Sequence, residues 1–357
     1  MNVTKTFLPP MEEYIHYFQR AYDKVWLTNR GELVKELEDK LKLYLDVDYL
    51  TLTTNGTLPL QIAIKALELK GEIITTPFSY VATTTAIVWE HCTPIFVDIE
   101  PDYLTIDPSK IEAAISENTS AILATHVFGN PCDVEAIEKI AKKHNLKVIY
   151  DAAHCFGVRY KGESVFNYGD VSTCSFHATK IFHTGEGGCF ITKDEALHHK
   201  LYYHHNFGHK TATSFYGVGT NAKMSELQAA MGLAVFDHID EIIEKRKMVV
   251  ESYNEHLTHQ KLQLLKIREN TEWNYHYYPV IFESEETLLQ VEASLNQKNI
   301  FPRRYFYPSL NTLDYVDNNI IPISESIAKR ILCLPLSTEM NETQVKQITK
   351  ILLENLT

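Results

Sequence analysis

The sequence contains no C-x-x-C pair and no apolar run long enough to cross a membrane. Its 6 cysteines stand apart from one another, so neither a zinc ribbon nor a thioredoxin-like motif is predicted. No stretch approaches the roughly 18 consecutive apolar residues of a spanning helix. The opening MNVTKTFLPPMEEY also lacks the basic and then apolar segments of a secretory signal. We therefore expect a cytoplasmic protein with buried free thiols and no membrane partner.

Basic residues are in deficit as well. Lys and Arg total 34 against 46 Asp and Glu, which gives a formal charge of −12. This charge repels polyanions, so no nucleic-acid partner is expected, although a local basic pocket for small phosphates is compatible with it. With 357 residues, 45% of them apolar and 22% charged, the chain is predicted to form about two globular domains.

Short β-branched apolar runs alternate with helical patterns between about residues 30 and 195. This alternation is typical of βαβ units, so the predicted fold class is α/β, with a mostly parallel mixed sheet flanked by helices. Strands are predicted at residues 49–54, 72–77, 93–99, 120–128, 146–153, 171–176 and 188–192. Helices are predicted at 31–45, at 133–145 and after residue 57, with Asp107 and Asp133 as helix starts.

The pattern changes near residue 236. A charged helix is predicted at residues 237–257, a strand at 275–283 and a final helix at 341–356. We therefore expect a large α/β domain over residues 1–235 and a smaller α+β domain over residues 236–357.

The segment CSFHATKIFHTGEGGCFIT places Lys180 in a polar turn between two predicted strands. An isolated lysine is usually a solvated surface residue. Here, however, Ser175 precedes it, and Gly185, Gly187 and Gly188 follow. A hydroxyl for a phosphate, an amine for a carbonyl and glycines that let a flat ligand approach the backbone favour a Schiff-base site.

A second segment, LKVIYDAAHCFG, ends an apolar strand on Asp151, with His154 three residues later. Ligands bind at the carboxyl ends of strands in open α/β sheets, although Asp151 could equally cap the next helix. Together with Lys180 the catalytic interpretation is favoured. Pyridoxal 5'-phosphate needs an amine for its aldehyde and a carboxylate beside its ring nitrogen.

Two further segments offer phosphate and ring contacts. Asn55-Gly56-Thr57 lies between a strand and a helix whose first N–H groups can bind an anion, although an ordinary turn with an N-cap explains it as well. Tyr80 follows another strand and could stack on a planar cofactor. As an aromatic residue taken alone, it is more typical of a buried core position.

Six motifs in order carry a resemblance that covers essentially the whole chain. They are N-G-T, P-F-S-Y, D-A-A-H, S-F-H-A-T-K, G-E-G-G and G-T-N-A-K-M-S-E-L-Q-A-A-M-G. The sequence thereby resembles the DegT/DnrJ/EryC1/StrS family of sugar-nucleotide aminotransferases, of the aspartate aminotransferase-like fold type I. The resemblance implies a homodimeric enzyme with shared active sites that uses pyridoxal 5'-phosphate, with pyridoxamine 5'-phosphate in its cycle.

The resemblance also implies roles for matching residues. Lys180 becomes the Schiff-base lysine and proton shuttle, Asp151 the partner of the pyridine nitrogen, His154 a neighbour of the ring, and Tyr80 the stacking ring.

For the cofactor phosphate, the family pattern implies the backbone N–H groups of Gly56 and Thr57, the hydroxyl of Ser175, and Asn221 of the partner subunit.

Two departures from the family pattern stand near residue 221. Lys223 replaces the usual Arg, and residues 205–208 replace an R-N-h-G run, so contacts made by those arginines are in question. His204, His205 and His209 have no carboxylate or cysteine at ligand spacing, so no metal site is predicted.

The segments VTKTFLPP, WLTNRG, FHATKIFHT and RRYFYPSL most resemble the family branch that aminates dTDP-4-keto-6-deoxy-D-glucose. Arg303, Arg304, Tyr305 and Tyr307 lie in the last of these and are candidate contacts for the dTDP-sugar, with a solvated basic turn as the equal alternative.

The implied reaction is a ping-pong transfer from L-glutamate that yields dTDP-4-amino-4,6-dideoxy-D-glucose, for a bacterial surface polysaccharide such as O-antigen. Amination at C3 and the galacto 4-amino epimer stay open. A dehydratase is disfavoured because Lys180 is present, and a cofactor-binding regulator because no DNA-binding segment is apparent.

Overall fold

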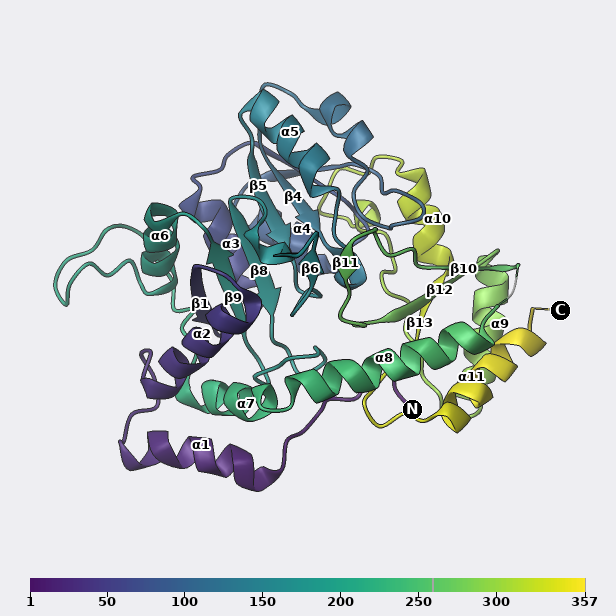
Figure 1. Cartoon of the computed structure of the whole chain (residues 1–357). Coiled ribbons are helices and arrows are strands. Elements are labelled where there is room, and N and C mark those ends of the chain that lie inside the picture. Colours follow the sequence, from purple (N-terminus) through teal and green to yellow (C-terminus); the bar gives the residue numbers. More distant parts are fainter. Residues whose placement is uncertain (259, 357) are drawn as a thin grey trace.

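A seven-stranded sheet forms the centre of the larger part of the molecule (Figure 1). The computed structural model describes residues 1–258 and 260–356. In spatial order the strands are β1 (Tyr49–Thr53), β9 (Gly188–Thr192), β8 (Val171–Ser175), β5 (Lys147–Asp151), β4 (Thr119–Thr125), β2 (Glu72–Thr75) and β3 (Thr93–Phe96). Strand β9 is antiparallel to both neighbours, and the other neighbouring pairs are parallel. The predicted α/β class is confirmed.

Helices flank this sheet, and three of them, after β1, β2 and β4, connect its strands. They are α1 (Met11–Asp23), α2 (Glu32–Leu45), α3 (Leu58–Ala66), α4 (Val81–Trp89), α5 (Val134–His144), α6 (Glu195–His205) and α7 (Glu226–Phe236). Helix α5 begins and ends at the residues that its sequence indicates, Asp133 and Asn145. The Asp133 carboxylate accepts the Ala136 N–H at 3.0 Å, and Asn145 ends the helix in the left-handed region at φ 53°. Asp107, the other expected start, begins only the short 3₁₀ turn Pro108–Lys110.

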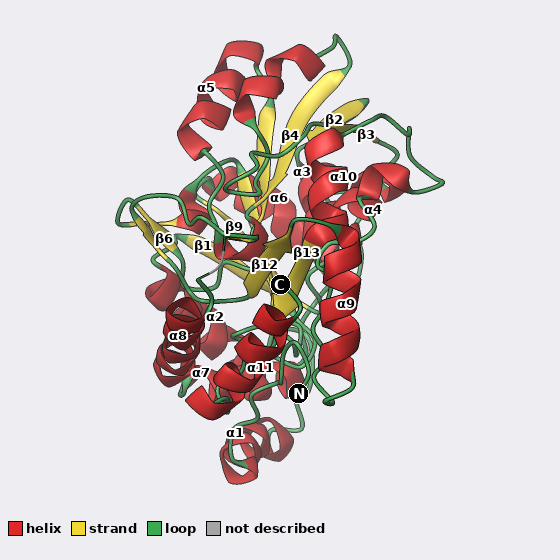
Figure 2. Ribbon diagram, turned by 90° about the vertical axis from the view of Figure 1, so that its right-hand side faces the viewer, coloured by secondary structure: helices red, strands yellow, loops and turns green. Residues whose placement is uncertain are grey.

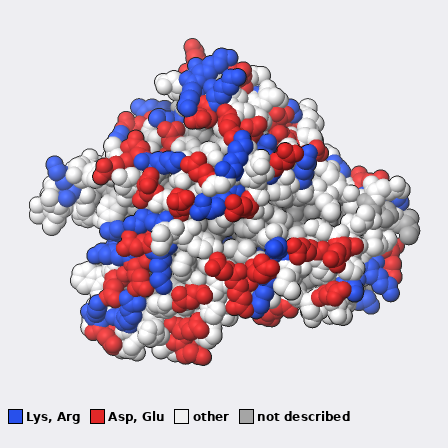
Figure 3. All heavy atoms as spheres, viewed as in Figure 1, with Lys and Arg blue, Asp and Glu red and all other residues white. Residues whose placement is uncertain are grey.

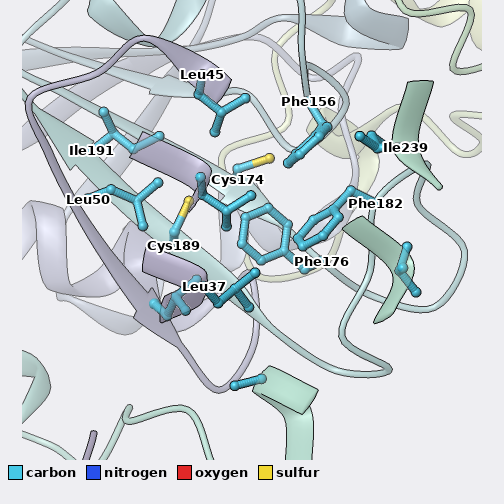
Figure 4. Close-up of a cluster of buried hydrophobic side chains, with 14 of the residues drawn as sticks. Leu37, Leu45, Leu50, Phe156, Cys174, Phe176, Phe182, Cys189, Ile191 and Ile239 are labelled. Atoms are coloured by element: carbon cyan, nitrogen blue, oxygen red, sulfur yellow. The ribbon is translucent and has the colours of Figure 1, made fainter. Parts of the chain in front are cut away.

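Aromatic and aliphatic side chains from one face of β8 and β9 and from the helices packed against it build a dense core (Figure 4). The rings of Phe156 and Phe182 stack with centroids 4.5 Å apart, and Phe176 meets Phe182 edge-on at 4.9 Å. Cys174 and Cys189 are register partners within it. All 6 cysteines are free and buried, as expected. This core fixes the ends of β8 and β9, where Ser175 and Gly188 lie.

A three-stranded antiparallel sheet organises the smaller part, which faces the viewer in Figure 2. It consists of β10 (Leu262–Leu264), β12 (Tyr278–Phe282) and β13 (Ile331–Leu334), with helices α9 (Glu285–Asn296), α10 (Pro322–Arg330) and α11 (Glu342–Glu354). A second small sheet joins β11 (Thr271–Glu272) to β6 (Arg159–Tyr160) and β7 (Glu163–Ser164) of the larger part.

Helix α8 (Ile239–His256) connects the two parts (Figure 1). Its first turns bury Ile239 and Ile242 in the core beside the large sheet, while Val250 and Tyr253 belong to the core of the smaller sheet. The predicted boundary between residues 235 and 236 falls at the end of α7, just before this helix. The first residues also join the smaller part, because the Leu336 N–H donates to the Val3 carbonyl at 3.0 Å.

Charged side chains of both signs are interspersed over the face shown in Figure 3. Across residues 1–258 and 260–356, none of the helices combines the length and the apolar character needed to cross a membrane.

Candidate active site

A cavity of about 350 Å³ opens at the carboxyl ends of β4, β5 and β8. This is the edge of an α/β sheet where ligands bind. Nine of the predicted site residues line it: Gly56, Thr57, Tyr80, Asp151, His154, Ser175, Lys180, Arg303 and Tyr305. The structure therefore brings together segments that lie far apart in the sequence.

Lys180 occupies the turn between β8 and β9, and its backbone N–H donates to the His177 carbonyl at 2.8 Å. Within the described part of the chain, its side-chain amine makes no hydrogen bond or ion pair. Burial lowers the pKa of Lys180 to about 8, although the charge of Asp151 and the Cys174 thiol act in the opposite direction. A partly buried amine with this pKa is available as a nucleophile near neutral pH.

Asp151 ends β5 and is buried. Its Oδ2 accepts the Thr83 hydroxyl at 2.6 Å, and its Oδ1 accepts the Ala153 N–H at 3.2 Å. Burial raises the pKa of Asp151, and these two hydrogen bonds together with Lys180 oppose that rise. Turns follow β5 along residues 152–158, so the alternative in which Asp151 caps a helix is wrong.

The His154 ring is buried among aromatic side chains. Its Nδ1 accepts the Phe128 N–H at 3.1 Å, which leaves the proton of the neutral ring on Nε2. The rings of Phe128 and Phe306 lie nearly parallel to it, with centroids at 6.2 and 5.9 Å. Burial, with a smaller contribution from Lys180, holds the pKa of His154 well below its usual value, so this histidine is a neutral donor.

The turn before α3 approaches the end of β8 very closely. A Cβ on Gly56 would lie 2.6 Å from the Ser175 Cβ, so only glycine fits there. The Asn55 side-chain oxygen accepts the N–H groups of Thr57 and Leu58, each at 2.9 Å. The expected role of the Thr57 N–H therefore needs correction, because that N–H is already occupied. In the region that the structure describes, the Gly56 N–H and the Thr57 hydroxyl make no hydrogen bond.

Tyr80 is the N-cap of α4, and its side chain is 55% exposed on the cavity. The alternative of a buried core aromatic is wrong. Its ring lies 6.5 Å from that of Phe306, which packs on His154.

The two adjacent arginines of the segment 303–307 point to different places. Arg303 lines the cavity and lies over the Tyr305 ring at 4.7 Å. Arg304 instead pairs with Glu285 at 2.5 Å and lies over the Tyr307 ring at 3.7 Å. Arg304 and Tyr307 do not line the cavity, so their predicted contact with the sugar nucleotide is not supported within this chain.

Asn221 lies outside this cavity too. Its side-chain oxygen accepts from the Lys223 amine at 2.7 Å, and its backbone pairs with that of Asn206. The loop that begins after α6 projects from the body of the molecule (Figure 1), and it exposes Phe215 and Tyr216. The nearby histidines contact backbone carbonyls, and the described residues assemble no group of three metal-binding side chains.

Sequence reasoning missed several residues of the cavity and of its support. These are Thr83, which binds Asp151, and the lining residues His177, Glu186, Tyr277 and Phe306. The sequence could have indicated Phe306, because this residue lies inside the segment RRYFYPSL. Thr83 was not, because its contact with Asp151 crosses 68 residues.

The donor set fits pyridoxal 5'-phosphate. The cavity offers an amine without a partner in the described chain, a buried carboxylate one strand away, and a glycine-lined turn with a free N–H and two hydroxyls for a phosphate. These are the groups that a carbonyl, a pyridine nitrogen and a phosphate require.

Comparisons with known proteins agree with this geometry. The sequence profile of the DegT/DnrJ/EryC1/StrS aminotransferase family matches residues 10–353. The dTDP-4-amino-4,6-dideoxy-D-glucose transaminase of Shigella dysenteriae is 40% identical over an alignment of 362 positions, which covers 99% of this chain and 98% of that protein. The GDP-perosamine synthase of Escherichia coli O157:H7 is 30% identical over 92% of each chain.

Among solved structures, that of DesI in the presence of its TDP-sugar product superposes with a TM-score of 0.93 at 31% identity. The superposition covers 100% of this chain and 92% of the other.

Proposed function

This chain belongs to the DegT/DnrJ/EryC1/StrS aminotransferase family, and from that membership we propose that it transfers the amino group of L-glutamate to dTDP-4-keto-6-deoxy-D-glucose. The chain is a pyridoxal phosphate-dependent transaminase. The observation that carries the choice of sugar is the 40% identity, over nearly the full length of both chains, to a transaminase named for the 4-amino product.

Lys180 and Asp151 perform the central steps in this proposal. Pyridoxal phosphate, when bound, withdraws electrons from the carbon that loses its proton. The amine of Lys180 would hold the cofactor through its carbonyl carbon. When free, it would act as the base that takes the α-proton of the donor amino acid and delivers it to that cofactor carbon, and in the second half of the cycle it would carry a proton in the reverse direction, to the sugar carbon that receives the nitrogen. The Asp151 carboxylate, held by Thr83, would keep the pyridine nitrogen protonated. The neutral His154, whose Nδ1 is occupied by Phe128, would offer its Nε2 proton to the cofactor.

The remaining lining residues bind and orient. Ser175, Gly56 and the Thr57 hydroxyl would hold the cofactor phosphate, and Tyr80 would stack on its ring. Arg303 is the arginine at the cavity that can contact the diphosphate. Asn221 would reach the phosphate from the partner subunit of a homodimer, which fits its position outside the cavity of its own chain.

A panel of nucleotide sugars tests the proposal. The purified protein with pyridoxal phosphate and glutamate is offered dTDP-4-keto-6-deoxy-D-glucose, its GDP-linked 4-keto counterpart and a dTDP-linked 3-keto sugar, and products are identified by NMR. We expect turnover of the first, with an equatorial amine at C4. An axial amine would change the product to the galacto epimer. Preference for the GDP-linked or 3-keto sugar would overturn the proposed substrate.

A further inference from the structure

A chain of buried hydroxyl groups ends on the Asp151 carboxylate. Thr83 Oγ1 lies 2.6 Å from Asp151 Oδ2, Ser79 Oγ lies 2.7 Å from Thr83 Oγ1, and Thr125 Oγ1 lies 3.0 Å from Ser79 Oγ. Each of these residues is at most 6% exposed.

Separate elements supply these groups. Thr125 ends β4 directly beside Asp151 in the strand register, Thr83 lies in the first turn of α4, and Ser79 precedes that helix. Thr83 and Ser79 are four residues apart. The chain of hydroxyls therefore runs from Ser79 and Thr125, which line the cavity, through Thr83, which is not among the lining residues, to the carboxylate.

The direction of the hydrogen bonds follows from the charge at the end of the chain. An ionised carboxylate only accepts, so Thr83 donates to Asp151. The single hydroxyl proton of Thr83 is then used, and its oxygen accepts from Ser79. Ser79 in turn can only accept from Thr125. All three dipoles thus point their positive ends toward Asp151.

From this geometry we infer that Thr125, Ser79 and Thr83 are positioning residues, which hold the Asp151 carboxylate ionised and oriented toward the cofactor ring nitrogen. The inference deepens the proposed function and rests on its assignment of Asp151. Aligned hydrogen bonds strengthen one another in a low-dielectric interior, so the effect on the carboxylate exceeds that of one hydroxyl. Thr83, which makes the direct contact, should matter most.

Thr84 provides a matched control. It follows Thr83 in the same helical turn, is 0% exposed, and its hydroxyl has no partner among the described residues. Thr83→Val and Thr84→Val make the same isosteric change, and only the first removes a hydrogen bond to Asp151. Thr83→Ser keeps the hydroxyl and serves as the rescue variant.

The first measurement is cofactor affinity, from absorbance titration of the cofactor-free proteins with pyridoxal phosphate. We expect Thr83→Val to bind about 10-fold more weakly, because a hydrogen bond to a charged group is lost. Thr83→Ser and Thr84→Val should stay within about 2-fold of the unmodified protein. Equal affinities of Thr83→Val and Thr84→Val would overturn the inference.

The second measurement is the melting temperature of the cofactor-free proteins at several pH values. Burial raises the pKa of Asp151, so the free energy of unfolding falls as pH rises through that pKa and the buried carboxyl ionises. The hydrogen bond from Thr83 stabilises the ionised form and makes this fall smaller. Lys180 is the charged group facing Asp151. The nearby thiols stay neutral, because burial raises the pKa of Cys155 and raises that of Cys174 to about 12. The deficit of Thr83→Val should therefore grow with pH, and that of Thr84→Val should not.

If the melting temperature of Thr83→Val is lower by the same amount at every pH, the inference is contradicted, because a loss of packing alone has the same effect at every pH. Failure of the proposed function has a different signature. In that case the unmodified protein forms no amino sugar from glutamate and the dTDP sugar, while the Thr83 effects on cofactor binding and on melting are still observed.

Discussion

Lys180 and Asp151 face one cavity, and burial moves their pKa values in opposite directions. Burial lowers the pKa of the lysine to about 8 and raises that of the aspartate, because each loses hydration of its charged form. Their mutual attraction opposes both shifts. The result is an amine that is partly neutral near physiological pH, beside a carboxylate that hydrogen bonds help to keep ionised.

The pKa of Lys180 predicts how fast the cofactor is captured. Only the neutral amine attacks a carbonyl, so the rate at which cofactor-free protein binds pyridoxal phosphate should rise with pH and reach half its maximum at about 8. Stopped-flow absorbance between pH 6 and about 10 measures it. A rate that is still rising steeply at pH 10, as an exposed lysine would give, would contradict the burial of this amine.

Replacing Asp151 by Asn tests the partner of the ring nitrogen. The amide keeps the shape but cannot hold a proton on the pyridine nitrogen, so we expect kcat to fall about 100-fold with the fold intact. Steady-state kinetics and circular dichroism check this result. Asp102→Asn, an exposed aspartate outside the cavity, is the control. A kcat within about 3-fold of the unmodified protein would remove Asp151 from its role.

Sequence reasoning located Lys180, Asp151 and Ser175 because polar residues that follow apolar strands meet at one edge of a parallel sheet. It could not separate Arg303 from Arg304. Which of two adjacent side chains faces the cavity depends on where Glu285 lies, and that residue comes from α9. The occupation of the Thr57 N–H by Asn55 was likewise a matter of side-chain geometry that a motif does not encode.

At the scale of elements, α2 begins without a capping side chain of its own. Its N-cap is Gly31, and the buried Glu226 of α7 supplies the missing acceptor. The Glu226 carboxylate accepts the Leu33 N–H at 2.8 Å and the Val34 N–H at 3.2 Å. A Cβ on Gly31 would lie 2.6 Å from Glu226, so the glycine is needed for this approach. The cap comes from 193 residues away, which explains why the local sequence did not reveal it.

Glu226→Ala should therefore destabilise the protein by about 2 kcal/mol, since two N–H groups at a helix start lose their partner. Urea unfolding measures this loss. Glu255→Ala, at an exposed position near the end of α8, is the control and should change the free energy of unfolding by less than about 0.5 kcal/mol. Equal effects of the two substitutions would show that the cap contributes nothing.

Of the three predicted site residues that do not line the cavity, Asn221 is the one expected to act from the partner subunit. Asn221 lies outside the cavity of its own chain, at the base of the projecting loop (Figure 1). Tyr22 in the last turn of α1, and Val25 and Trp26 after that helix, are also exposed apolar residues, which are common at interfaces. In this chain Asn221 does not share the cavity of Lys180, so the prediction of a shared site is one for the dimer.

Mixing two inactive variants tests that prediction. When Lys180→Ala and Asn221→Ala chains are co-expressed, half of the dimers are mixed and each mixed dimer holds one intact site, so about a quarter of full activity should return. Lys180→Ala with Asp151→Asn is the control, because both residues line the cavity of one chain and no intact site can form. Activity that stays at the level of the separate variants would contradict a site shared between subunits.

The transfer of nitrogen from glutamate to the sugar through Lys180 is the central step of the proposed reaction. The direct measurement supplies ¹⁵N-labelled L-glutamate, pyridoxal phosphate and dTDP-4-keto-6-deoxy-D-glucose, and follows the label by NMR. We predict that ¹⁵N appears on C4 of the sugar in step with the formation of 2-oxoglutarate, and that Lys180→Ala transfers none. A sugar without the label, or equal transfer by Lys180→Ala, would contradict the account.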